Sequence, residues 1–308
     1  TITDIEEYAG KLYLGTYGFG VLKMDYSGEL EDRILMADNK IPHGGNFIKC
    51  LEIRDSKMYV ASTFGFYIYN LLSGKVMSTI HKNEKLGAHS LSGEKIECVF
   101  VDKIKNVWLG FTAEGINVSF FQAQKFPTSI SETNLTEIYS FCEAGKNQRL
   151  IGGTKTLCLV DANNNKIKDF SSKLDDNTVL CIYQESTSLF WIGTWGKGLY
   201  RLNIDNGEFK EIIKRTEGNT FLCLKPDGEG NIYAGTVGEG YFRINIVSLK
   251  FEKFNEDPAL AGMSINTFYK DKNGAVWLGT YDGRLVKTSG YKADGKFEVI
   301  QIYKNEGK

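Results

Sequence analysis

A short unit recurs seven times along the 308 residues of this chain, and its clearest copy reads Trp191, Ile192, Gly193 and Thr194. The unit places an aromatic residue, an aliphatic residue, a glycine and a small hydroxyl residue in that order. Its third position falls at Gly15, Ala61, Gly110, Gly152, Gly193, Gly235 and Gly279, so successive copies lie 41 to 49 residues apart. A period of this length is typical of propellers, solenoids and other arrays, in which most residues serve the architecture. Only the differences between copies are then left to carry function.

Each copy predicts four antiparallel strands. In the third copy, an apolar segment from Ile96 to Val101 is followed by a polar turn and a second apolar segment, Val107 to Gly110; Ile116 to Phe121 is a third strand, and a weaker fourth follows near Phe126. Several strands are apolar at consecutive positions, which indicates burial on both faces. The sequence therefore predicts an all-β fold, a seven-bladed β-propeller with four-stranded antiparallel blades in one domain, 1–308. The predicted blades are 1–39, 46–83, 94–130, 135–172, 177–215, 219–256 and 264–303.

Two further positions of the repeat have an architectural interpretation. The residue two before the anchor glycine is expected in the core, and the anchor itself is expected where a neighbouring backbone or ring comes close. The core position holds Tyr13, Tyr59, Trp108, Leu150, Trp191, Tyr233 and Trp277. A second set of glycines precedes the third strand: Gly20, Gly65, Gly115, Gly198, Gly240 and Gly283. Because no helical pattern follows them, these glycines predict hairpin turns with positive φ and not a phosphate-binding loop.

The cysteines also follow the repeat. Five of the six occupy what we interpret as one equivalent position, 10 to 12 residues before the anchor: Cys50, Cys98, Cys142, Cys181 and Cys223. Equivalent positions on neighbouring blades rarely touch, and a disulfide needs α-carbons within about 7 Å. We therefore expect free thiols that pack as small apolar groups. The cysteine count does not indicate a compartment.

Composition excludes several classes of function. Lys and Arg total 37 and Asp and Glu total 38, so no net field attracts nucleic acid or an anionic membrane. No apolar run reaches the roughly 20 residues of a membrane helix, and no membrane contact by this segment is expected. The histidines, His43, His81 and His89, lack metal-ligand spacing, and no Ser-His-Asp arrangement can be nominated. We expect no catalytic residue, metal or cofactor, and His43 and His89 are interpreted as solvated loop residues.

Several copies resemble a known family. Val107 to Thr112 (VWLGFT), Trp191 to Leu202 (WIGTWGKGLYRL), Ile232 to Gly240 (IYAGTVGEG) and Val276 to Gly283 (VWLGTYDG) resemble the two-component regulator propeller repeat. The resemblance implies the periplasmic sensor region of a hybrid two-component histidine kinase of Bacteroidetes-type bacteria, and an excerpt of a longer protein. Such regions usually contain two propellers followed by an immunoglobulin-like domain, a membrane helix, a kinase and a regulator. Members commonly respond to glycan breakdown products. The WD40 repeat fits less well, because its Gly-His and Trp-Asp dipeptides are absent.

The residues that the repeat leaves unexplained lie in the loops between second and third strands, which emerge on one rim of a propeller. The candidates are Tyr17, Phe19, Phe64, Glu114, Lys155, Trp195, Lys197, Glu239, Tyr281, Asp282 and Arg284. Aromatic rings beside fixed polar groups suit a carbohydrate ligand, and Arg284 and Lys197 would suit an acidic sugar. The alternative is that these are scattered surface aromatics. The connectors Asp38 to Asn46, Asn83 to Glu94 and Asn255 to Ser264 could contact the ligand, a second propeller or a twin subunit.

The leading hypothesis is a non-enzymatic sensor that binds a carbohydrate. A carboxylate pair of the glycosidase kind is not excluded by the sequence, and fold alone does not settle function. Two alternatives therefore stay open: an extracellular carbohydrate-active enzyme (a hydrolase or lyase) on the same scaffold, and a protein-interaction platform.

Overall fold

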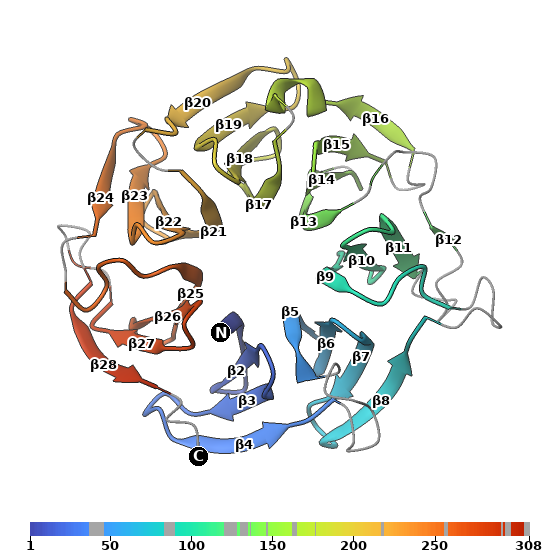
Figure 1. The fold of residues 1–308 in the computed structure, drawn as a ribbon, viewed down its shortest axis with the longest axis vertical. Coiled ribbons are helices and arrows are strands. Elements are labelled where there is room, and N and C mark those ends of the chain that lie inside the picture. Colours follow the sequence, from blue (N-terminus) through green and yellow to red (C-terminus); the bar gives the residue numbers. More distant parts are fainter. Residues whose placement is uncertain are drawn as a thin grey trace. The chain divides into compact units, whose positions relative to one another are not determined.

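The computed structural model describes residues 1–36, 46–82, 90–119, 128–129, 135, 137–145, 147–161, 165–175, 177–216, 219–255, 258–290, 292 and 297–304. Within these ranges the strands run from β1 to β28, and one short 3₁₀ helix, η3, covers Ser171–Leu174. The strands form seven four-stranded antiparallel sheets, each built from four consecutive strands (Figure 1). The fold is a seven-bladed β-propeller, as the repeat predicts.

The chain divides into two compact units, Glu6–Val179 and Thr1–Ile5 with Leu180–Lys308, called here the N-terminal and C-terminal units. β1 (Ile2–Tyr8) begins in the C-terminal unit and continues into the N-terminal one, where it pairs with β2 (Lys11–Thr16), followed by β3 (Gly20–Met24) and β4 (Leu30–Ile34). The remaining sheets of the N-terminal unit are β5 (Ile48–Arg54), β6 (Lys57–Ser62), β7 (Gly65–Asn70) and β8 (Lys75–Ile80); β9 (Ile96–Val101), β10 (Val107–Phe111), β11 (Ile116–Ser119) and β12 (Thr128–Ser129); and β13 (Ile138–Glu143), β14 (Arg149–Gly153), β15 (Thr156–Val160) and β16 (Lys166–Asp169).

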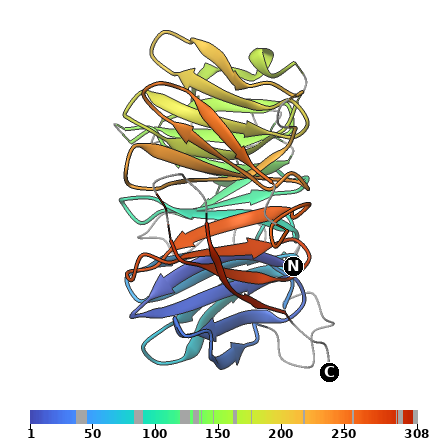
Figure 2. The ribbon, with the colours of Figure 1, turned by 90° about the vertical axis from the view of Figure 1, so that its left-hand side faces the viewer.

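The C-terminal unit holds the other three sheets. They are β17 (Val179–Gln184), β18 (Leu189–Thr194), β19 (Leu199–Asn203) and β20 (Phe209–Ile213); β21 (Phe221–Pro226), β22 (Asn231–Thr236), β23 (Tyr241–Asn245) and β24 (Phe251–Phe254); and β25 (Ile265–Lys270), β26 (Val276–Thr280), β27 (Leu285–Thr288) and β28 (Val299–Tyr303). In Figure 2 the last two of these sheets lie one above the other, and their first strands, β21 and β25, are neighbours.

Agreement with the sequence is close in the third blade. β9 covers the predicted first strand, and β11 ends at Ser119, two residues before the predicted end. Phe126, near which a fourth strand is predicted, lies outside the described residues, and the fourth strand that the structure describes, β12, lies at Thr128–Ser129.

The anchor glycines lie where blades come closest. A Cβ on Gly110 would lie 2.7 Å from the sulfur of Cys98 and 2.8 Å from the carbonyl oxygen of Ile138, which begins the next blade. A Cβ on Gly193 would overlap the sulfur of Cys181 and lie 3.0 Å from Cβ of Phe221, again in the next blade. The predicted close approach is confirmed, because in both cases a side chain would displace a neighbouring strand.

The aromatic position two before the anchor is core in every blade, and none of these side chains is more than 9% exposed. The glycines before the third strand are confirmed as turn residues, with φ from +73° at Gly115 to +135° at Gly65. Only glycine adopts such values without strain.

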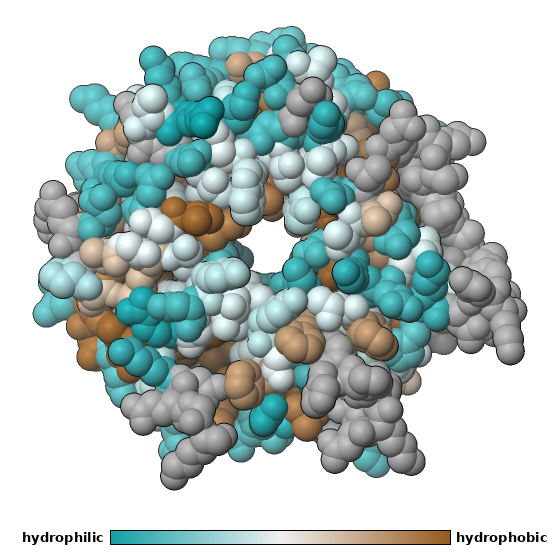
Figure 3. Space-filling model, viewed as in Figure 1, coloured by the Kyte–Doolittle hydropathy of each residue, from teal (hydrophilic) through white to brown (hydrophobic). Residues whose placement is uncertain are grey.

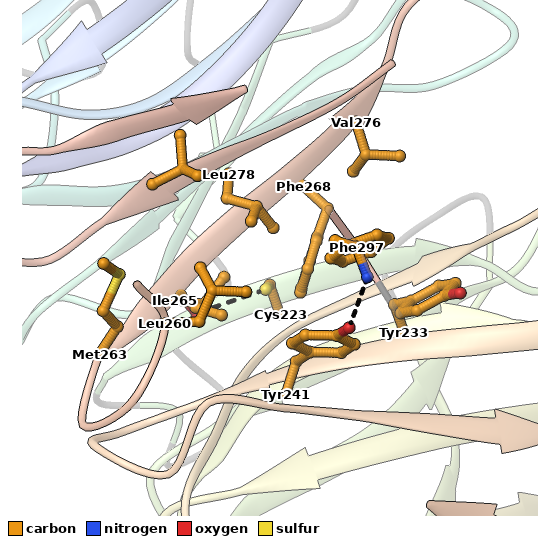
Figure 4. Close-up of a cluster of buried hydrophobic side chains, with 11 residues drawn as sticks. Cys223, Tyr233, Tyr241, Leu260, Met263, Ile265, Phe268, Val276, Leu278 and Phe297 are labelled. Atoms are coloured by element: carbon orange, nitrogen blue, oxygen red, sulfur yellow. Dashed lines mark hydrogen bonds between the residues drawn. The ribbon is translucent and has the colours of Figure 1, made fainter. Parts of the chain in front are cut away.

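Figure 4 shows the core between the β21–β24 and β25–β28 sheets. Tyr233 and Tyr241 stack on the ring of Phe297, with centroids 4.9 and 4.7 Å apart, and the Tyr241 hydroxyl accepts a hydrogen bond of 3.2 Å from the Phe297 amide. The Cys223 thiol donates to the carbonyl of Ile265, with sulfur and oxygen 3.5 Å apart. Aromatic rings and one thiol thus join neighbouring blades.

The prediction of free thiols is confirmed, but the equivalent position is wrong for one cysteine, Cys142. All six thiols are free, and burial raises the pKa of Cys223 to about 12. Cys142, however, pairs with Leu150, whereas Ser140 lies opposite the anchor Gly152. An offset of two residues keeps a side chain on the same face of a strand, so counting from the sequence did not distinguish these positions.

One buried ion pair was not predicted. Arg149 begins β14, at a position where β10 has Val107, and its guanidinium pairs with Asp102 in the preceding blade. The side chains are 2% and 0% exposed, and Trp108 Nε1 donates to the same carboxylate over 3.1 Å. The guanidinium also lies 4.8 Å from the centroid of the Trp108 ring. A charged group is tolerated in this core because it is paired and hydrogen-bonded.

Candidate functional site

The loops between second and third strands share one edge of each sheet with the beginnings of the first strands. In the third blade, Ile96 at the start of β9 pairs with Phe111 at the end of β10, and in the second blade Ile48 pairs with Ser62 in the same way. We call this edge, within each unit, the loop edge. It brings the rim candidates of each unit next to the first residues of the inner strands.

In the N-terminal unit, the loop edge exposes Tyr17, Phe19 and Phe64. The Tyr17 ring is 46% exposed and packs edge-on against Phe47, with centroids 4.7 Å apart. An antiparallel bridge between these two residues fixes the backbone beneath the ring. The guanidinium carbon of Arg33 lies over the Phe19 ring, 5.1 Å from the ring centroid. Arg33 Nε also donates a 2.9 Å hydrogen bond to the carbonyl oxygen of Phe19. The rings are therefore held and remain accessible.

In the C-terminal unit, the loop edge exposes Trp195 and Tyr281, which are 59% and 66% exposed. The backbone beside Trp195 is fixed by a 3.0 Å hydrogen bond from the Gly196 amide to Thr220 Oγ1. The Tyr281 amide donates to the carbonyl of Ser264 over 3.0 Å. Both rings thus project from anchored loops.

Exposed aromatic residues concentrate at the loop edge. Among the residues that the structure describes, every exposed Phe, Tyr or Trp side chain lies in one of these loops: Tyr17, Phe19, Phe64, Trp195 and Tyr281. The other exposed large hydrophobics are aliphatic, for example Leu72 and Val247. On the face drawn in Figure 3, brown side chains form small groups between teal ones. The coloured residues of that face therefore do not form one large apolar patch. The loop edge is distinguished instead by its exposed aromatic side chains.

Most charged candidates have partners on the protein. Glu239 pairs with Lys253 Nζ at 2.6 Å, and Arg284 pairs with Asp282 of its own loop. Burial alone would raise the pKa of Asp282, but hydrogen bonds from Arg284 and Thr280 outweigh it and hold the pKa below its ordinary value. The charge of Arg284 is therefore already compensated, which weakens its assignment to an acidic sugar.

The remaining candidates are held mainly through their backbones. Lys155 is exposed, and its amide donates to the carbonyl of Asn177 over 2.9 Å. Lys197 is half-buried, and its carbonyl accepts from the Tyr200 hydroxyl over 3.0 Å. Glu114 is exposed. None of these contacts assigns a ligand, so the roles of these residues stay predictions.

Sequence reasoning missed a polar row in the N-terminal unit, made of Lys49, Glu97, Glu137 and Tyr139. Lys49 Nζ lies 2.9 Å from Glu97 Oε2 and 5.7 Å from the centroid of Tyr17. The Tyr139 hydroxyl lies 3.4 Å from Glu137 Oε2. Lys49, Glu97 and Tyr139 directly follow the buried aliphatic residue that begins each first strand. A polar residue inside an otherwise apolar run was the available signal.

Only one histidine and parts of the connectors lie within the described residues. His81 Nδ1 lies 2.6 Å from the carbonyl oxygen of Phe64. His43 and His89 lie outside the described residues, as do 38–45, 83–89 and 256–257 of the candidate connectors. In the described part of the chain, no group of three or more His, Cys, Asp or Glu side chains could hold a metal ion. The same part contains no helix with the length and apolarity needed to cross a membrane.

Comparisons with known proteins agree with the repeat. Residues 259–282 match the family described as two component regulator propeller. The chain contains a two-component regulator propeller repeat. The resemblance inferred from the sequence is thus confirmed at the junction of the sixth and seventh blades. None of the curated protein sequences matches the chain.

Solved structures show the same fold at low identity. The extracellular domain of a one-component system from B. thetaiotaomicron superposes with a TM-score of 0.74 at 18% identity, over 93% of this chain and 38% of that one. A structure described as the extracellular domain of a hybrid two-component system from B. thetaiotaomicron gives 0.56 at 16% identity, over 100% and 47%. The WD40 propeller domain of Doa1 gives 0.69 at 12%, over 93% and 91%. The chain thus spans less than half of the two bacterial extracellular domains.

Proposed function

We propose that this chain is a ligand-sensing propeller domain of a hybrid two-component system, located outside the cytoplasm, in the periplasm, and responding to glycan-derived oligosaccharides. Two observations support the proposal. One repeat matches the two-component regulator propeller family, and the two bacterial structures that share the fold are extracellular domains of signalling systems. The rest of such a protein, including the kinase, would lie in other segments.

The concentration of exposed aromatic rings at the loop edge carries the ligand assignment. A pyranose presents an apolar face that stacks on an aromatic ring, while its hydroxyls need fixed polar partners. Trp195 and Tyr281 in one unit, and Tyr17 in the other, provide accessible rings on anchored loops. The domain would then act by binding, and differential affinity for two arrangements of the longer protein would transmit the signal. A second propeller or a twin subunit is the partner that such a rearrangement requires.

The test is calorimetric titration of the domain with a panel of oligosaccharides. Trp195→Ala should weaken binding of the sugar that the wild type binds, while stability changes by no more than about 0.5 kcal/mol, because the side chain is exposed. Val247→Ser is the matched control, because Val247 is 86% exposed and lies in a turn between third and fourth strands. Equal affinity of wild type and Trp195→Ala would remove Trp195 from the site. Chromatography of the same mixtures tests the enzymatic alternative, since new products would contradict a binding-only role.

A further inference from the structure

The polar row of the N-terminal unit extends across three neighbouring blades. It runs from Lys49, which lies beside the Tyr17 ring, to Glu97, and then to Tyr139 and Glu137. Burial raises the pKa of Tyr139, and the negative charges of Glu137 and Glu97 raise it further. The adjacent Cys98 thiol donates to the carbonyl of Ile138 over 3.5 Å, so the strands that hold Glu97 and Tyr139 are neighbours at this point.

Each member of the row keeps partial access to solvent. The side chains of Lys49 and Glu97 are 27% and 15% exposed, and Glu137 and Tyr139 are half-buried. Thr112 Oγ1 donates to Glu97 Oε1 over 2.9 Å, and the hydroxyl of Thr154 donates to Glu137. These bonds fix the carboxylates, but a carboxylate accepts about four hydrogen bonds and an ammonium donates three. The row therefore holds oriented donors and acceptors with unused capacity.

An aromatic platform adjoins this row. The Tyr17 ring is exposed and held by Phe47, and Lys49 lies between the ring and Glu97. A ring that stacks on a sugar face, followed by groups that bond its hydroxyls, is the arrangement that binding of a polyhydroxylated ligand needs. The residues equivalent to Lys49 and Glu97 in the first two blades of the C-terminal unit are Leu180 and Leu222, so these two first strands do not repeat this chemistry.

Charge limits the kind of sugar. Binding a carboxylate or sulfate favours an arginine or lysine whose charge is not already compensated. Lys49 is paired with Glu97, and on the loop edge of the other unit Arg284 is paired with Asp282. Glu137 adds a second carboxylate to the row, which would repel an anionic ligand. Hydroxyl groups meet no such cost.

We propose that Tyr17 and the polar row form a subsite for an uncharged oligosaccharide, with Tyr17 as the stacking platform, Glu97, Glu137 and the Tyr139 hydroxyl oxygen as acceptors, and Lys49 as the donor. This inference rests on the proposed function and narrows it. It also replaces the acidic sugar that Arg284 and Lys197 suggest from the sequence.

The experiment uses the 308-residue chain and isothermal calorimetry with neutral trisaccharides of glucose, mannose and galactose, and with trigalacturonate as the acidic probe. We expect at least one neutral probe to bind and trigalacturonate not to bind. Tyr17→Ala and Glu137→Gln should each weaken binding about tenfold. The first removes the stacking ring, and the second replaces a carboxylate by a neutral amide, which forms a weaker hydrogen bond with a sugar hydroxyl. Glu143→Gln is the matched control, because Glu143 is an ion-paired carboxylate at the other end of β13 and is not a member of the row. Circular dichroism melts check that each variant is folded.

The outcomes separate this inference from the proposed function. Binding of trigalacturonate in preference to the neutral probes overturns the uncharged subsite and leaves glycan sensing intact. Neutral binding that Trp195→Ala weakens, but Tyr17→Ala and Glu137→Gln leave unchanged, overturns the location and leaves glycan sensing intact. Failure of every probe to bind at millimolar concentration contradicts both. If Glu137→Gln does not fold, Lys49→Met serves as the second row variant and is likewise expected to weaken neutral binding.

Discussion

Replacing Gly193 with valine should destabilise the packing between the β17–β20 and β21–β24 sheets far more than an average point mutation. The Cβ would overlap the Cys181 sulfur and would lie 3.0 Å from Cβ and 3.3 Å from the carbonyl oxygen of Phe221. Phe221 is fully buried, and its carbonyl accepts from the Cys181 thiol over 3.5 Å, so neither neighbour can move without disturbing an inter-blade contact. Valine adds three carbon atoms, and overpacking of a core costs about 1–3 kcal/mol. Displacement of the strand adds to this, and we expect about 3–5 kcal/mol in total.

The assay is urea unfolding followed by tryptophan fluorescence, because Trp191 is buried two residues before the substituted glycine. A double-mutant cycle with Cys181→Ala and Gly193→Ala isolates the clash. Removing the sulfur should recover part of the cost, because the Cys181 sulfur is the atom that the added Cβ would overlap most. An unfolding midpoint for Gly193→Val equal to that of the wild type would refute the interpretation of the anchor glycines.

Two other perturbations test the core. Asp102→Ala leaves Arg149 buried without its partner and should cost about 3–5 kcal/mol; Asp271→Ala, which also removes a bond to a tryptophan, Trp277, is the control and should cost less in the same urea assay. Burial raises the pKa of Cys158 and Cys223 to about 12, above the ordinary value of 9.0. The folded state therefore keeps thiol protons that the unfolded state loses, so stability present below pH 9 falls as pH rises toward 12, by up to about 1.4 kcal/mol per pH unit for each thiol. Cys223→Ala should show a shallower decline between pH 9 and 11, and an identical slope would contradict the burial argument.

The fold was predictable because the repeat reports packing directly. The anchor glycine, the aromatic residue two before it and the turn glycine recur at fixed positions, and each has one physical requirement: close approach, burial or positive φ. Positions were harder to predict where two residues of one strand could take the same place in the packing. Cys142 and Ser140 differ by one pleat period, and only the register with Gly152 shows which of them faces the anchor.

The ion pair between Arg149 and Asp102 illustrates a second limit. Its partners are 47 residues apart, and nothing local in either segment requires the other. An arginine at the start of a buried strand reads from sequence as a weak copy of the repeat. In the structure it is a charged link between two blades, paired with a carboxylate and packed against a ring. Long-range compensation of this kind is visible only once the blades are stacked.

The candidate site contains residues that the sequence identified and residues that it did not. The aromatic loop residues were identifiable because they depart from the repeat, and their common exposure follows from the fold that the repeat specifies. The polar row was hidden, since Lys49, Glu97 and Tyr139 lie inside strands that were read as packing. In all three strands, the polar residue directly after the first buried aliphatic one keeps partial access to solvent. In a propeller, the residues most informative about ligand chemistry therefore include the polar interruptions of the inner strands as well as the variable loops.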